Sequence, residues 1–115
     1  MAKYKREVYE SAGRLVLKEA GGIKNLTEYC VGLIRYNGNL EQGCKEYVKQ
    51  DVLIYTADRE AWLKRRGINT KNPDKIFDEI CGKAANYLVL NYMKKHKLGI
   101  IRVGKTILNA KLVKM

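Results

Sequence analysis

The run of regularly spaced apolar residues between Asn72 and Gly99 limits what this chain can fold into more than any other feature. Asn72 is a residue type that caps helix N-termini, and Pro73 suits the first helical position because its missing N–H would have no partner there. Apolar side chains then recur three or four residues apart, as one face of a helix requires. They are Ile76, Phe77, Ile80, Cys81, Ala84, Tyr87, Leu88 and Tyr92. The pattern predicts a helix over 73–97 that packs along this face against the core.

Shorter stretches with the same spacing predict helices upstream. They are 3–20, 26–36, 40–50 and 56–66. Asn25 and Asn39 precede the second and third stretches, each with Glu or Gln three residues later, which is the pattern of a capping box. The pair 26–36 and 40–50 also has the length and tight turn of a helix-turn-helix, whose second helix reads DNA. An ordinary antiparallel helical hairpin has the same pattern, and we favour that interpretation.

The C-terminal residues change in character. Segments 100–103 and 106–113 are rich in β-branched residues and largely alternate, and Gly104-Lys105 separates them, so they predict a β-hairpin. With 115 residues, the chain has the length of one domain, 1–115. The expected fold is therefore mainly α within the α+β class: a compact helical domain of four to five helices with a C-terminal two-stranded β-ribbon. Whether the ribbon pairs within one chain or across a homodimer is left open.

Positive charge is concentrated in the second half of the chain. The formal net charge is +11, and no carboxylate side chain follows Glu79, whereas lysines and one arginine continue to the end. Like charges repel, so a solvated surface normally mixes both signs. The sequence therefore predicts an anionic partner, either a nucleic acid (RNA or DNA) or an acidic protein.

We expect a small basic nucleic-acid-binding protein that acts through the phosphate backbone. Arginine guanidinium groups bind phosphate with two parallel hydrogen bonds, and lysines contribute charge. The candidate residues are Lys64, Arg65, Arg66, Lys71, Lys94, Lys95, Lys97, Arg102, Lys105 and Lys111. We expect these side chains to form one continuous surface. The alternative is a protein-interaction module or inhibitor whose basic face docks an acidic partner.

Catalysis and cofactor binding have little support in the sequence. His96 stands beside three lysines, as in the active site of an RNase-like toxin, but proton transfer needs a poised partner group and none is evident. We assign no catalytic residue, no metal ligand and no cofactor. The three cysteines, Cys30, Cys44 and Cys81, lack metal-ligand spacing and are expected to be buried thiols. This favours a cytoplasmic protein, and no segment is apolar enough to predict a membrane span.

Overall fold

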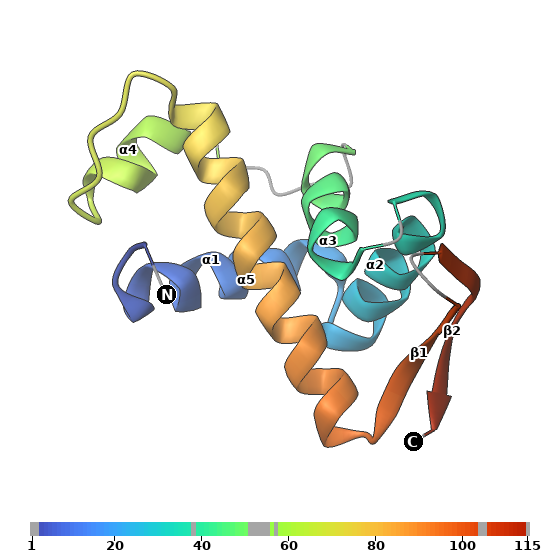
Figure 1. Ribbon diagram of the computed structural model, residues 1–115. Coiled ribbons are helices and arrows are strands. Elements are labelled where there is room, and N and C mark those ends of the chain that lie inside the picture. The colour runs from blue at the N-terminus through green and yellow to red at the C-terminus, as the bar shows by residue number, and fades with distance from the viewer. Residues whose placement is uncertain (1–2, 38, 51–55, 57, 104–105, 115) are drawn as a thin grey trace.

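The computed structural model describes the backbone of residues 3–37, 39–50, 56, 58–103 and 106–114, and the side chains of 3–34, 39–50, 56 and 58–97. The helices are α1 (Arg6–Ala20), α2 (Ile23–Asn37), α3 (Leu40–Lys49), α4 (Arg59–Lys64) and α5 (Pro73–Lys95) (Figure 1). The prediction of a mainly helical domain is confirmed, with five helices in the described residues. Two strands follow, β1 (Leu98–Val103) and β2 (Thr106–Lys114), whose backbones pair antiparallel.

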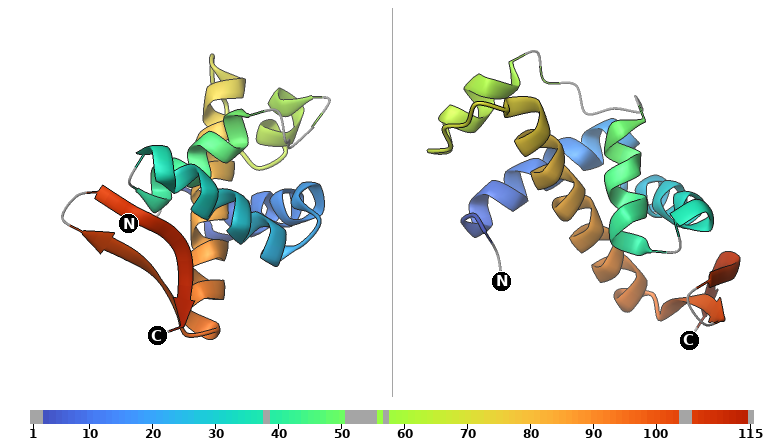
Figure 2. Two further views of the ribbon diagram at one scale, coloured as in Figure 1. Left: turned by 90° about the vertical axis from the view of Figure 1, so that its right-hand side faces the viewer. Right: turned by 45° about the horizontal axis from the view of Figure 1, so that its top comes forward.

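Helix α5 runs through the middle of the molecule, and the other helices are arranged around it (Figures 1 and 2). Helix α1 crosses α5 at Gly13, where an added Cβ would lie 3.4 Å from Leu88 Cδ1. Helix α3 crosses α5 at Gly82, where an added Cβ would lie 3.0 Å from Lys45 Cγ. Helix α4 lies against the N-terminal part of α5 (Figure 2). Glycines thus allow two of these helices to approach the central one closely.

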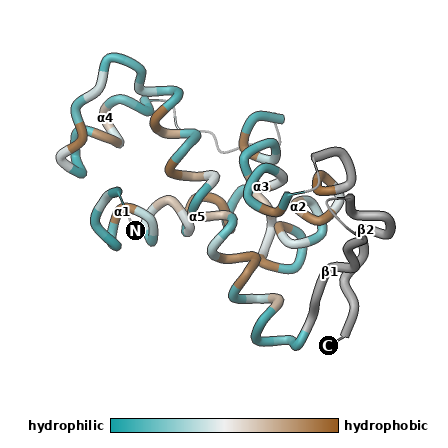
Figure 3. Tube along the Cα trace, viewed as in Figure 1, coloured by the Kyte–Doolittle hydropathy of each residue, from teal (hydrophilic) through white to brown (hydrophobic). Residues whose placement is uncertain are grey.

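The core takes buried side chains from all five helices. The largest fully buried ones include Leu26 of α2, Tyr47 of α3, Leu63 of α4 and Phe77 of α5, and Val16 represents α1. In Figure 3 the apolar residues of these helices lie where the helices face one another. The three cysteines are buried free thiols, as predicted. No helix in the described part of the chain is long and apolar enough to cross a membrane.

The predicted start of the second helix is wrong by three residues. Helix α2 begins at Ile23, so Asn25 lies inside its first turn and does not cap it. The turn is closed by the Leu26 N–H, which donates to the Gly22 carbonyl at 3.1 Å, and by the Thr27 hydroxyl, which donates to the Ile23 carbonyl at 2.8 Å. Of the second predicted capping box, the structure shows the Asn39 cap: Asn39 Oδ1 accepts a hydrogen bond from the Gln42 N–H at 2.9 Å, whereas the Gln42 side chain donates to Glu46 Oε1 at 2.8 Å.

The prediction that Tyr87 belongs to the buried face of α5 is also wrong, because Tyr87 is 69% exposed. In the first half of α5 the buried side chains include Phe77 and Ile80, whereas in the second half they are Ala85, Val89 and Met93. At about 100° per residue, this second set lies on a different side of the helix from the first. The buried face therefore turns along α5, since different helices cover its two halves, and Tyr87 falls outside it.

The buried thiols and the phenol of Tyr47 predict a loss of stability in alkali. Burial raises the pKa of Cys81 from 9.0 to about 12 and that of Tyr47 from 10.0 to about 12. A hydrogen bond with Cys30 and burial also raise the pKa of Cys44. The folded protein keeps these protons while the unfolded chain loses them. Unfolding therefore becomes more favourable above pH 9, by up to about 1.4 kcal/mol per pH unit for each thiol.

Urea unfolding followed by circular dichroism at pH 8 and pH 10.5 measures this dependence. The urea midpoint is expected to fall at the higher pH, and Cys81→Ala should make the fall smaller. A midpoint that does not change between these pH values would contradict the prediction.

Candidate nucleic-acid interface

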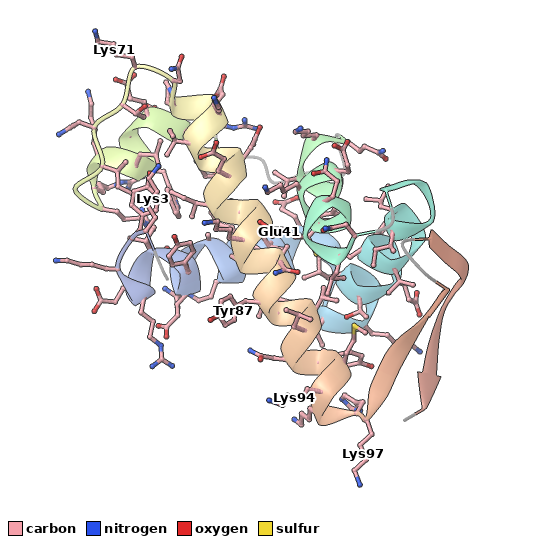
Figure 4. The ribbon with its side chains drawn as sticks, in the orientation of Figure 1. Lys3, Glu41, Lys71, Tyr87, Lys94 and Lys97 are labelled. Carbon is pink, nitrogen blue, oxygen red and sulfur yellow. The ribbon has the colours of Figure 1, made fainter. Side chains whose placement is uncertain are left out.

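The structure does not bring the predicted basic residues into one surface. The side chains described form two groups, one at α4 and the loop after it (Lys64, Arg65, Arg66 and Lys71) and one at the end of α5 (Lys94, Lys95 and Lys97). Helix α5 has 23 residues and at 1.5 Å per residue is about 34 Å long. Figure 4 shows Lys71 near one end of this helix and Lys94 and Lys97 at the other. The expectation of a single continuous surface is wrong for these seven. Arg102, Lys105 and Lys111 lie outside the described side chains.

In the first group, the side chains differ in how far their charge is neutralised. Lys64 forms an ion pair with Glu60 one turn earlier, with 3.1 Å between Nζ and Oε1. Arg65 is exposed, and its Nε donates to the Ala61 carbonyl at 3.4 Å without a carboxylate partner among the described residues. Lys71 is exposed in the loop. Glu60 thus neutralises the charge of Lys64 on the helix surface, while no carboxylate among the described residues neutralises the charges of Arg65 and Lys71.

Arg66 is held in a defined position between α4 and α1. Its guanidinium carbon lies 3.6 Å from the centre of the Trp62 ring, and its Nη1 donates to the Trp62 carbonyl at 2.7 Å. Its Nε donates to the Ser11 hydroxyl oxygen at 3.2 Å, and its Nη2 donates to the same oxygen. Trp62 is itself fixed by the core, where its ring meets Phe77 edge to face with centroids 5.2 Å apart. The orientation of the guanidinium is therefore set by core packing and by a residue 55 positions away in the sequence.

Beside Arg66 there is an open hollow of about 580 Å³ between α1 and α4, with a predominantly cationic rim. Lys5, Ser11, Arg65 and Arg66 line it, and Glu7 is the one acidic side chain among its lining residues. Partial burial and the nearby charges of Arg65 and Arg14 lower the pKa of the Arg66 guanidinium. Several cations are thus held close together at one place.

Two residues that line this hollow, Lys5 and Ser11, and the nearby Arg14 were missed by sequence reasoning. The N-terminal half of the chain is nearly neutral, with nine basic and seven acidic residues up to Ala57, so its cations did not stand out. Nothing in the spacing of α1 links Ser11 to Arg66. The site exists only because the tertiary structure places Ser11 of α1 beside Arg66, which follows the end of α4.

The second group lies at the C-terminal end of α5. Lys94, Lys95, His96 and Lys97 are exposed, and none of them has an ion-pair partner among the described residues. The His96 ring packs on Tyr92 with centroids 4.3 Å apart. Positive side chains here complement the negative end of the helix dipole. This interaction with the helix dipole is one reason for lysines at this position. Their ammonium groups remain exposed to solvent.

The interpretation of the 40–50 segment as ordinary packing is favoured over DNA reading. On α3, Lys45 pairs with Glu41 at 3.4 Å and Lys49 pairs with Glu46 at 3.7 Å. These cations are thus neutralised within the helix, and the two glutamates would face phosphates in a groove. Helix α3 instead packs closely on α2, where an added Cβ at Gly43 would lie 2.8 Å from the Cys30 carbonyl oxygen.

In the part of the chain that the structure describes, no three His, Cys, Asp or Glu side chains come together as a metal site would need. Comparisons with protein-family models, curated proteins and solved structures find no match to this chain.

Proposed function

We propose that this protein binds nucleic acid through contacts with the phosphate backbone. The observation that carries the proposal is that cations without an ion-pair partner lie close together at two places in the structure. Arg6, Lys45, Lys49 and Lys64 are each paired with a carboxylate three or four residues away, whereas other helix cations such as Lys18 and Lys83 have no ion-pair partner among the described residues. The cations around the α1–α4 hollow and at the end of α5 have no such partner among the described residues. Unpaired cations at close spacing are stabilised by a polyanion.

The C-terminal ribbon, 98–114, belongs to this proposal. It follows directly on Lys97, and a basic two-stranded ribbon is a geometry that proteins use to follow phosphates or to enter a groove. Arg102, Lys105 and Lys111 would then extend the α5 group. We also place the protein in the cytoplasm, since its described cysteines are buried free thiols.

Salt dependence tests the proposal directly. Each phosphate that a cation neutralises releases a condensed counterion, so the logarithm of the binding constant falls by about 0.9 per contact and per tenfold increase in salt on duplex DNA. Arg65→Gln should reduce this slope by about one contact. The double variant Lys94→Gln/Lys95→Gln should reduce it by about two. Fluorescence anisotropy with labelled duplex and single-stranded oligonucleotides between 50 and ~300 mM salt provides the measurement.

The matched control is Lys49→Gln. It removes the same charge from an exposed lysine, but Lys49 is paired with Glu46. Its salt slope should equal that of the wild type. If binding does not change with salt, or if Lys49→Gln has the same effect as Arg65→Gln, the proposal is wrong. Copurification of a stoichiometric acidic protein, without nuclease-sensitive absorbance at 260 nm, would support the acidic-partner alternative instead.

A further inference from the structure

The donors of Arg66 are not all used within the protein. A guanidinium carries five N–H groups. Three of them donate to described residues: Nε and one N–H of Nη2 to Ser11, and one N–H of Nη1 to the Trp62 carbonyl. One N–H on Nη1 and one on Nη2 remain without a partner among the described residues. Arg66 lines the open hollow and is partly exposed, so an anion in that hollow can reach it.

Ser11 supplies a third donor at the same place. Its oxygen accepts both hydrogen bonds from Arg66, which occupy the two lone pairs of the hydroxyl. The hydroxyl proton has no acceptor among the described side chains and backbone, and it must point away from the guanidinium. Ser11 also lines the hollow. Arg66 and Ser11, which together have two N–H groups and one O–H group without partners among the described residues, therefore line the same open space.

The position of these donors is fixed before any ligand binds. A flexible arginine loses side-chain entropy when it binds, and a guanidinium that is already stacked and hydrogen-bonded loses much less. Arg66 is stacked on Trp62 and bonded to two different helices. An arginine that served only to join α4 to α1 would not need Arg14 and Arg65 near it, because their positive charges disfavour its charged form.

We propose that Arg66 and Ser11 form a phosphate-binding site, in which the two remaining N–H groups of Arg66 hold two oxygens of one backbone phosphate and the Ser11 hydroxyl donates a third hydrogen bond. This inference rests on the proposed function and identifies a backbone phosphate as the part of the nucleic acid that binds in the hollow. Lys5 and Arg65 at the rim favour phosphates on either side along the same strand. A backbone with a charge on every phosphate can bind several neighbouring cations at once, which the isolated carboxylates of a protein surface do not.

Charge-conserving variants test the inference. Arg66→Lys keeps the positive charge and loses the paired N–H geometry, so it should weaken binding of a ten-nucleotide oligouridylate about tenfold. Arg65→Lys is the matched control, because Arg65 is the neighbouring arginine and is exposed and not stacked on Trp62. This replacement should change affinity less than about twofold. Ser11→Ala should weaken binding by severalfold. Thermal unfolding of each variant shows whether it is folded at the assay temperature. If Arg66→Lys is unfolded there, Ser11→Ala still tests the inference.

Inorganic phosphate tests the same site without a nucleic acid. In ¹H–¹⁵N spectra of the arginine side chains, the Arg66 Nε–H signal, identified by its loss in Arg66→Lys, should shift and saturate with phosphate. It should not saturate with chloride at the same ionic strength. Absence of a saturable shift would overturn the inference.

The remaining outcomes separate the inference from the proposed function. If the wild type binds oligouridylate and the two lysine variants bind equally well, Arg66 holds no phosphate and the inference fails while the proposed function stands. If phosphate shifts Arg66 but no oligonucleotide binds, the site stands and the proposed function fails. If poly-glutamate shifts Arg66 as strongly as oligouridylate, the phosphate assignment is wrong and an acidic protein is the partner.

Discussion

Replacing Trp62 with alanine is expected to lower the free energy of unfolding by about 3–5 kcal/mol. Trp62 is 5% exposed, and its ring packs edge to face on Phe77, which is fully buried. The variant therefore loses the buried area of the largest side chain type and an aromatic pair, and it leaves a cavity between α4 and α5. Arg66 stacks on the Trp62 ring, so the guanidinium also loses its support. Few single changes in this chain should cost more.

Chemical unfolding followed by circular dichroism provides the measurement, since the variant has no tryptophan to report by fluorescence. Tyr87→Ala is the control, because it also removes an aromatic ring but from a side chain that is 69% exposed. It should change the free energy of unfolding by less than about 0.5 kcal/mol. Equal losses in the two variants would show that the Trp62–Phe77 contact does not stabilise the domain as the structure implies.

Gly43→Ala should destabilise the protein by about 1–3 kcal/mol, although alanine is the better helix former. An alanine Cβ at this position of α3 would lie 2.8 Å from the Cys30 carbonyl oxygen and 3.0 Å from Ile34 Cγ1. The carbonyl belongs to the backbone of α2, so it cannot move without moving the helix. Helices α2 and α3 would have to separate, which also disturbs the contact between the Cys30 and Cys44 thiols.

Gly32→Ala, in α2, gives the opposite expectation. Gly32 is exposed, and nothing among the described residues lies within 4 Å of an added Cβ. Alanine should therefore stabilise by about 0.5–1 kcal/mol through its higher helix propensity. The difference in thermal midpoint between the two variants measures how much stability depends on the close approach of α3 to α2 at Gly43. If both substitutions shift the midpoint in the same direction, α2 and α3 do not pack as closely as the structure shows.

Much of the helical architecture could be predicted, because helix formation depends on neighbours in the sequence. Asn72-Pro73 marks the start of α5, and Asn39 caps α3 through its side chain. The errors arose where the outcome depended on neighbours in space. Asn25 fits a capping box, but the turn after Gly22 lets the helix begin earlier. Tyr87 fits the apolar spacing of α5, but the buried face of that helix turns along its length.

For the basic residues too, some properties follow from the sequence and others depend on neighbours in space. Their number and the absence of carboxylates after Glu79 are properties of the sequence, and they predict an anionic partner without any structure. Which of them act together is not a property of the sequence. Lys64 and Lys94 were grouped because both belong to the basic second half of the chain, yet Lys64 is paired with Glu60 and the two lie near opposite ends of α5.

The sequence by itself determined the helices and the sign of the charge, because hydrogen bonding within a helix and net charge are local or additive quantities. Only the tertiary structure decided that Arg66 is stacked on Trp62 and bonded to Ser11, and that Lys5 and Arg14 stand near it. Hydrogen bonds and screened charges act over a few ångströms, so they depend on which helix surfaces meet. In this chain that is settled by the way α1 and α4 each pack on α5.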